Sequence, residues 1–231
     1  MSSPTRFPGG VGTAVPTASL GMLGMPDPSK YHVFWDDFNS PPLATEYTLS
    51  ATSVGAGTSA FSAADADGGV ARITTAANEN DGIFAELIGE GFLMEAGKKA
   101  WIKCRFQVGD AIESDMIIGL HSTSATPQAA TLRFLFETVD GAAAMYFNVD
   151  DNTTDADSGT VVTLADDTYV TVGAYYDGKG NIDLFLNDAK VTSMTGVAVP
   201  GAEMAVGFGY LNGASGAETT DIDYLLVAKE R

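Results

Sequence analysis

Trp101-Ile102-Lys103-Cys104-Arg105-Phe106-Gln107-Val108 is the stretch that decides the fold class. Its even-numbered residues are all apolar, and its odd-numbered residues are mostly polar. Side chains alternate between the two faces of a β-strand, so this two-residue period predicts a strand with one buried face. Cys104 falls on that face, where a thiol behaves as a small apolar group rather than as a nucleophile.

The same alternation recurs through most of the chain. It appears at residues 132–136, 170–176, 182–186, 204–210 and 222–226. Asp-Gly and Asn-Asp pairs of the kind found in hairpin turns lie between such stretches, and no long helical period is present. Many strands with short turns predict an all-β fold, a two-sheet antiparallel sandwich of the jelly-roll type.

The two ends of the predicted domain carry strand patterns that we expect to meet in one sheet. The closing strand, residues 220–229, is long and clearly alternating, and the first strand covers residues 31–38. We expect the closing strand to pair in the middle of a sheet, near the first strand. Residues 31–231 are therefore predicted to form one β-sandwich domain, a size at which such sandwiches often fold as a single unit.

Residues 1–30 differ from the rest and are predicted to form an extended, Pro/Gly-rich N-terminal arm. They hold five of the nine prolines, and proline excludes a helix or a central strand. The arm nevertheless carries large apolar side chains, and a flexible linker would carry more serine. Two alternatives follow: the arm lies on its own domain or is disordered, or it contacts a neighbouring chain. The candidate contact residues are Phe7, Val11, Val15, Leu20 and Leu23.

The composition is strongly acidic, with 30 Asp and Glu residues against 12 Lys and Arg residues and a formal net charge of −18. Such a surface repels nucleic acid and anionic lipid, so neither is an expected partner. Three interpretations of this charge follow: the acidic side chains keep the protein soluble, some of them face a basic partner, or some of them bind calcium. No stretch approaches the roughly 20 apolar residues of a membrane helix, and no signal peptide is recognised.

Part of the sequence resembles concanavalin A-like (laminin G-like) jelly rolls. The resemblance is carried by Tyr169–Asp177, a strand ending in Tyr-Asp, by Gly180–Asn187, and by the closing strand Ile222–Val227. Trp35-Asp36-Asp37-Phe38 resembles the first strand of such folds. The resemblance covers residues 30–231 and implies the same two-sheet sandwich.

The opening residues, Met1–Val11, resemble the start of small virion structural proteins of tailed bacteriophages. This second resemblance covers between 11 and 38 residues. It implies a capsid decoration (cement) protein, made in the host cytoplasm and located on the capsid surface of the virion. The implied partners are the major capsid protein and neighbouring copies of the chain, as a dimer or trimer.

The sequence offers little support for catalysis. Glycosidases with this fold place a nucleophile and an acid on one strand as Glu-x-Asp-x-x-Glu. The nearest match is Glu113-Ser-Asp115, but Ile118 stands where the third carboxylate would be. His32 and His121 lie alone on strands and are expected to be structural. We therefore predict that the chain is not an enzyme.

One cluster of oxygen-bearing side chains is a candidate calcium site. Calcium takes six to eight oxygen ligands, and Asp/Asn clusters also form ordinary turns with no ion. The spacing is not that of an EF-hand, and apart from calcium no cofactor is expected. The candidate ligands are Asp150, Asp151, Asn152, Asp155 and Asp157.

The only basic cluster surrounds a tryptophan, and we interpret it as a contact surface. An exposed Trp beside cations suits a protein interface or the stacking of a sugar ring, and the alternative is that the N-terminal arm covers this Trp. The alternative function to capsid decoration is therefore a carbohydrate-binding, lectin-like module on a phage surface or tail. The candidate surface residues are Lys98, Lys99, Trp101, Lys103 and Arg105.

Overall fold

The computed structural model of the chain describes residues 29–55, 57–64 and 68–231. The predicted arm contacts Phe7, Val11, Val15, Leu20 and Leu23 lie outside the described residues, so their role stays a prediction. The described part of the chain contains no helix with the length and apolar character that a bilayer crossing needs.

The described residues form β-strands and one short 3₁₀ helix, η1 (Pro127–Ala129). The strands are β1 (Tyr31–Asp36), β2 (Tyr47–Thr52), β3 (Ala60–Ala63), β4 (Ala71–Thr74), β5 (Gly82–Leu87), β6 (Phe92–Leu93), β7 (Ala100–Val108), β8 (Ser114–His121), β9 (Arg133–Thr138), β10 (Ala144–Asp150), β11 (Asp155–Thr163), β12 (Val170–Tyr176), β13 (Ile182–Leu186), β14 (Ala189–Met194), β15 (Glu203–Asn212) and β16 (Thr219–Glu230).

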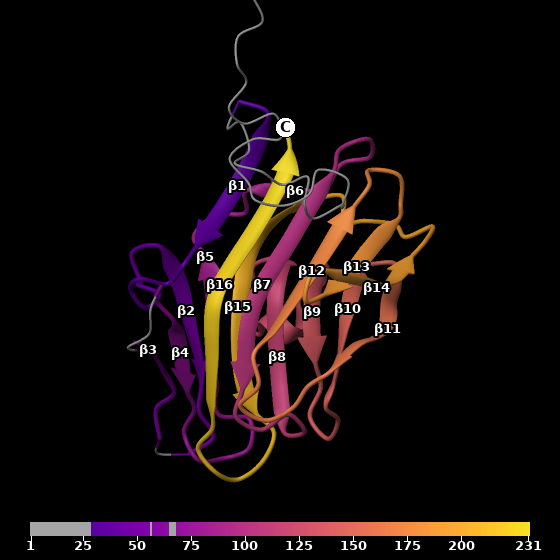
Figure 1. The fold of residues 1–231 in the computed structure, drawn as a ribbon. Helices are drawn as coiled ribbons and strands as arrows, with labels where there is room; N and C mark the ends of the chain where they lie inside the picture. The colour runs from indigo at the N-terminus through magenta and orange to yellow at the C-terminus, as the bar shows by residue number, and fades with distance from the viewer. Residues whose placement is uncertain (1–28, 56, 65–67) are drawn as a thin grey trace, which may run out of the picture.

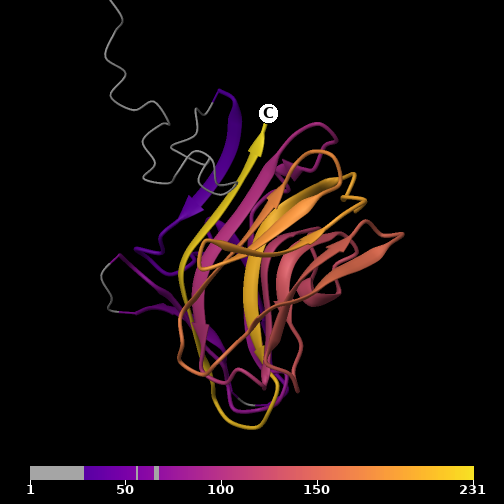
Figure 2. The same cartoon turned by 45° about the vertical axis from the view of Figure 1, so that its right-hand side comes forward.

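The strands form two antiparallel sheets that pack face to face, which confirms the predicted all-β sandwich (Figure 1). One sheet, here called the β7 sheet, has the order β14-β13-β12-β7-β16-β4-β3, and β1 pairs with β16. The other, the β8 sheet, has the order β11-β10-β9-β8-β15-β5-β2, and β6 pairs with β15. Figure 2 shows the two curved layers from the side.

The core lies between the two sheets and follows the alternation seen in the sequence. Ile102, Cys104 and Phe106 of β7 are fully buried, as the period of this strand predicts. Phe208 of β15 lies in an aromatic group, with the rings of Phe38, Tyr47 and Phe61 in edge-to-face contact around it. Such pairs contribute roughly 0.5–1.5 kcal/mol each beyond the area they bury. These four rings form one aromatic group within the core.

The first and last strands meet as the sequence predicts. β16 pairs with β1 over a register that runs from Tyr31 opposite Glu230 to Asp36 opposite Leu225. Its opposite edge pairs with β7 along most of its length, and β4 pairs with the same edge as β1, near the start of β16, so the closing strand is central to its sheet (Figure 1). The pairing brings the start and the end of the described domain together, because each supplies hydrogen bonds to the other's backbone.

The outer face of the β8 sheet is partly covered, which the alternating pattern alone does not predict. Glycines on this face let large neighbours pack down on the strands: a Cβ on Gly119 would lie 2.7 Å from Leu135 Cα, and one on Gly207 would collide with the His121 ring. A second, small apolar cluster forms there from Phe84, Ile117, Leu135 and Leu211.

Candidate functional site

A row of polar side chains crosses the outer face of β9, β10 and β11. The register places Arg133 opposite Asp150, and Asp150 opposite Asp155. Two residues further along, Asn148 of β10 lies opposite Asp157 of β11. Directly opposed residues on one sheet face lie close enough for their side chains to interact. The pairing of three strands therefore gathers groups that are up to 24 positions apart in sequence.

The connection between β8 and β9 forms a wall beside this row. It contains η1, whose Pro127 is buried, and Gln128 Nε2 donates a hydrogen bond to the Asp115 carbonyl at 3.4 Å. Between this wall and the strands lies an open cleft of about 390 Å³, within the roughly 300–1,000 Å³ range of small-molecule sites. Its lining residues are Asp115, Gln128, Arg133, Glu137, Thr138, Val139, Tyr146, Asn148, Asp155 and Asp157.

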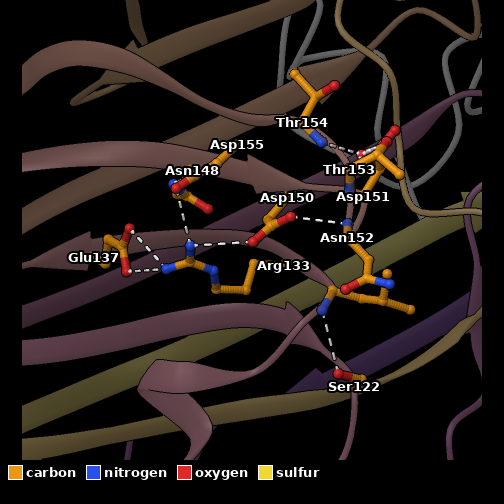
Figure 3. Close-up of polar contacts among 11 residues, drawn as sticks. Ser122, Arg133, Glu137, Asn148, Asp150, Asp151, Asn152, Thr153, Thr154 and Asp155 are labelled. Atoms are coloured by element: carbon orange, nitrogen blue, oxygen red, sulfur yellow. Dashed lines mark hydrogen bonds and ion pairs between the residues drawn. The ribbon is translucent and has the colours of Figure 1, made fainter.

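Arg133 is the central residue of the cleft (Figure 3). Its Nη1 contacts Glu137 Oε2 at 3.3 Å, and its Nη2 contacts Asp150 Oδ2 at 3.4 Å and Asp155 Oδ2 at 3.3 Å. One guanidinium therefore serves three carboxylates, and its side chain is mostly buried beneath them. Because a guanidinium presents several donors in a fixed plane, it holds these side chains in one arrangement.

The carboxyl group of Glu137 has a raised pKa. Burial raises the pKa of its carboxyl to about 7, against the opposing effect of Arg133 and with a further increase from Asp155. Burial likewise raises the pKa of Tyr146, its cross-strand neighbour, to about 12. A carboxyl that is half protonated near neutral pH, inside a cleft, is a candidate for proton transfer.

Two buried polar atoms in the cleft lack partners among the described residues. Asn148 is 3% exposed, and its Nδ2 donates a 2.6 Å hydrogen bond to Asp155 Oδ1. Its Oδ1 has no hydrogen-bond partner, and neither does Nε of Arg133. Buried polar atoms are nearly always satisfied, so an unpaired acceptor beside a cleft indicates a place for a bound donor.

His121 lies opposite Arg133, and its structural role stays a prediction. His121 is fully buried at the end of β8, and its Nδ1 lies 3.0 Å from the Ser122 carbonyl oxygen. Burial lowers the pKa of its imidazole. Glu86 lies beside it, with 3.5 Å between His121 Nδ1 and Glu86 Oε1, and Glu86 also accepts a hydrogen bond from the Ser124 amide.

The five candidate calcium ligands are not gathered around one point. Asp150 and Asp155 contact Arg133, while Asp151 accepts hydrogen bonds from Thr153 and the Thr154 amide within its own turn. Across residues 29–55, 57–64 and 68–231, no group of three or more His, Cys, Asp or Glu side chains is arranged to hold a metal ion. Asn152 lies in the tight connection between β10 and β11, where its amide donates to Asp150, and Asp157 lies in β11, at the edge of the β8 sheet.

The basic cluster on β7 differs from its prediction in one respect. Trp101 is 2% exposed, so the expectation of an exposed tryptophan is wrong. The rings of Tyr31 and Tyr175 pack against it with centroids 5.8 and 5.6 Å away, and the register of β12 places Tyr175 directly opposite it.

Three of the four cations of that cluster, Lys98, Lys103 and Arg105, are paired with carboxylates of the same chain. Lys98 lies 3.6 Å from Glu95, and Lys103 lies 2.6 Å from Asp188. Arg105 contacts Asp223 and also lies over the Tyr169 ring, 4.1 Å from its centroid. The backbone amide of Lys99 donates to Glu230 Oε2 at 2.9 Å. The role of this surface in binding a partner stays a prediction.

Sequence reasoning found some of the cleft residues but not the cleft. Asp155 and Asp157 were singled out as calcium ligands, and Asp115 as part of an incomplete glycosidase motif. Arg133 and Glu137 were missed, although they occupy outward-facing positions of one alternating strand. The signal available was that alternation, with an arginine and a glutamate four residues apart on the polar face.

Comparisons with known proteins support the fold. No family model matches the chain, and no curated protein matches it in sequence. Among solved structures, an endo-beta-1,4-glucuronan lyase from the fungus Trichoderma reesei is similar, with a TM-score of 0.58, 11% identity, and coverage of 84% of this chain and 94% of that one.

Two further structures have the same architecture. The carbohydrate recognition domain of Emp47p is similar, with a TM-score of 0.57, 12% identity, and coverage of 87% of this chain and 98% of that domain. An endo-1,3-beta-glucanase from Streptomyces sioyaensis has a TM-score of 0.55, 12% identity, and coverage of 88% and 98%. At this identity the likeness shows the fold alone, and it confirms the concanavalin-like jelly roll.

These structures also overturn the prediction that the chain is not an enzyme. Two of the three are enzymes, a lyase and a glucanase, on the same sandwich. The prediction rested on the incomplete glycosidase motif at Glu113 and Asp115 and on the isolated positions of the two histidines. Catalytic groups can be joined in space from several strands, so a missing linear motif does not exclude catalysis.

Proposed function

We propose that the chain binds carbohydrate in the cleft over β8 to β11. The observation that carries this proposal is the unpartnered Oδ1 of the buried Asn148 at a cleft lined with hydrogen-bonding side chains. Sugars present many hydroxyl donors and acceptors, and few precisely placed polar groups fix their orientation. Proteins with the same fold include a carbohydrate recognition domain, which supports the class of ligand.

The test uses purified full-length protein on an array of oligosaccharides, followed by calorimetric titration with the best binder. Asn148→Ala removes the unpartnered acceptor, and Gln128→Ala changes the wall without altering the sheet. We expect each to weaken binding by up to about ten-fold, the value of roughly one hydrogen bond. Gln107→Ala, on the outer face of the opposite sheet, is the matched control. Wild-type affinity in both folded cleft variants contradicts the proposal.

A second candidate function, cleavage of the bound glycan, is favoured by Glu137. Its pKa of about 7 and its place in the cleft suit a group that gives or takes a proton near neutral pH. On this candidate, incubation with the bound glycan releases new chain ends, and Glu137→Gln abolishes that release while binding persists. The absence of new chain ends from the wild-type protein would remove this candidate and leave binding intact.

The assembly role implied by the N-terminal resemblance stays a prediction. It names the major capsid protein and neighbouring copies of the chain as partners, and the virion as location. Nothing in the comparisons indicates a phage or capsid protein. The arm that carries the resemblance lies mostly outside the described residues, so no contact described above bears on it.

A further inference from the structure

The cleft has an excess of negative charge that bears on its ligand. Four carboxyl groups line it, those of Asp115, Glu137, Asp155 and Asp157, against the single guanidinium of Arg133. That guanidinium is already shared between Glu137, Asp155 and the adjacent Asp150. The cleft lining therefore contains carboxylate oxygens whose negative charge Arg133 does not neutralise.

The open rim of the cleft carries the most accessible of these groups. Asp155 is exposed at the start of β11, with 59% of its side chain accessible, and Asp157 is exposed two residues later on the same face. Asp157 accepts a 2.7 Å hydrogen bond from the Gly159 amide through Oδ1.

A second, independent observation points to a ligand that donates hydrogen bonds. The Oδ1 of Asn148, directly across from Asp157, is a buried acceptor without a partner. An ammonium group has three donors, no acceptor and a positive charge, so it matches both the unpaired acceptor and the carboxylates at the rim. A uronic acid brings a carboxylate to the same place, where like charges repel.

We infer that the cleft selects glycans that carry free amino groups, of the glucosamine type, over neutral glycans and over uronates. This inference rests on the proposed function, since it names the sugar class that the same cleft takes. The amino group lies at the rim, beside Asp155 and Asp157, and the hydroxyl groups face the interior of the cleft. Charge attraction at an exposed rim is screened by salt, so the preference weakens as ionic strength rises.

The test compares three tetrasaccharides by titration calorimetry at about pH 6, where an amine of ordinary basicity is protonated. The probes are the tetramers of glucosamine, of N-acetylglucosamine and of glucuronic acid. We expect the glucosamine tetramer to bind at least about ten-fold more tightly than the acetylated one, a difference of one hydrogen-bonded charge. Glucuronate is expected to bind most weakly.

The matched variants separate the cleft from the general acidity of the protein. Asp155→Asn with Asp157→Asn is expected to bring the preference for the glucosamine tetramer close to one. Asp183→Asn with Asp188→Asn removes the same charge from ion pairs on the opposite sheet and is expected to leave the preference unchanged. Loss of preference in both double variants overturns the inference.

The remaining outcomes distinguish this inference from the proposed function. If the acetylated or uronate tetramer binds in the cleft as tightly as the glucosamine tetramer, the inference fails and carbohydrate binding stands. If a lysine-rich peptide binds more tightly than any glycan, the cleft recognises a cationic peptide and the inference fails. If none of the tetramers binds, the inference is overturned, and the oligosaccharide array decides the proposed function separately.

Discussion

Glu137 shows what the environment of one residue changes. In sequence it is an outward-facing glutamate on an alternating strand, and its ordinary carboxyl would be ionised well below neutral pH. In the folded chain it is 6% exposed, and burial raises its pKa to about 7 although Arg133 lies 3.3 Å away. Desolvation therefore outweighs the attraction of the nearby cation at this position.

The raised pKa of Glu137 predicts how stability depends on pH. A carboxyl whose folded pKa lies above its unfolded value stabilises the fold fully below the unfolded pKa, and this contribution is lost as pH rises through the folded pKa. For Glu137 the window runs from the ordinary carboxyl pKa of 4.5 to the raised pKa of about 7. The contribution lost over that window is about 3 kcal/mol, at 1.36 kcal/mol for each pKa unit.

Glu137→Gln is the variant that tests this dependence. We expect it to flatten the fall of the free energy of unfolding between about pH 4.5 and 7 and to be more stable than wild type at about pH 8. Urea unfolding followed across this range measures both. Asp183→Asn, in an exposed ion pair on the other sheet, serves as control. An unchanged pH profile in Glu137→Gln contradicts the assignment.

At the scale of elements, the central strands of the β8 sheet depend on glycine. Gly119 of β8 has a φ of +151° and lies opposite Leu135 of β9. A Cβ there would lie 2.7 Å from Leu135 Cα and 2.8 Å from the Phe134 carbonyl oxygen, both backbone atoms that cannot rotate away. The close approach holds β9, and with it Arg133 and the cleft, against β8.

Gly119→Ala is therefore expected to destabilise the domain by about 1–3 kcal/mol, the usual cost of overpacking. Gly201→Ala is the matched control, because a Cβ on Gly201 meets no atom within 4 Å and its φ is not in the left-handed region. The measurement is the free energy of unfolding of both variants in urea. Equal stabilities would show that β9 can move away from β8 without cost.

At the scale of the whole molecule, the fold brings the first and last strands together. β1 lies beside β16, and at the start of the described residues the Arg231 amide donates a hydrogen bond to the Lys30 carbonyl at 2.8 Å. The predicted assembly concerns the whole molecule, because the predicted contact between copies is made by a segment outside the sandwich.

Deletion of residues 1–30 tests that prediction. We expect the full chain to be a dimer or trimer by light scattering and the truncated chain to be a folded monomer, because the apolar arm is the predicted contact. Circular dichroism confirms that the sandwich remains intact. Equal masses for the two proteins would show that the arm does not join copies of the chain in solution.

The all-β class, the strand alternation of β7 and the pairing of the closing strand with the first can be predicted from the amino-acid sequence. These follow from side-chain periodicity, which burial of one sheet face imposes on every strand directly. Asp155 and Asp157 were visible as carboxylates, and Cys104 was correctly placed in the core.

The surroundings of those carboxylates, in contrast, depend on how the strands pack in three dimensions. The cleft joins residues of β8, β9, β10 and β11 with the wall that contains η1, and the strand register places Arg133 between Glu137, Asp150 and Asp155. The register between these strands is set by the packing of whole strands, so no local sequence pattern predicts it. The same packing buries Trp101 and raises the pKa of Glu137, because both depend on neighbours distant in sequence.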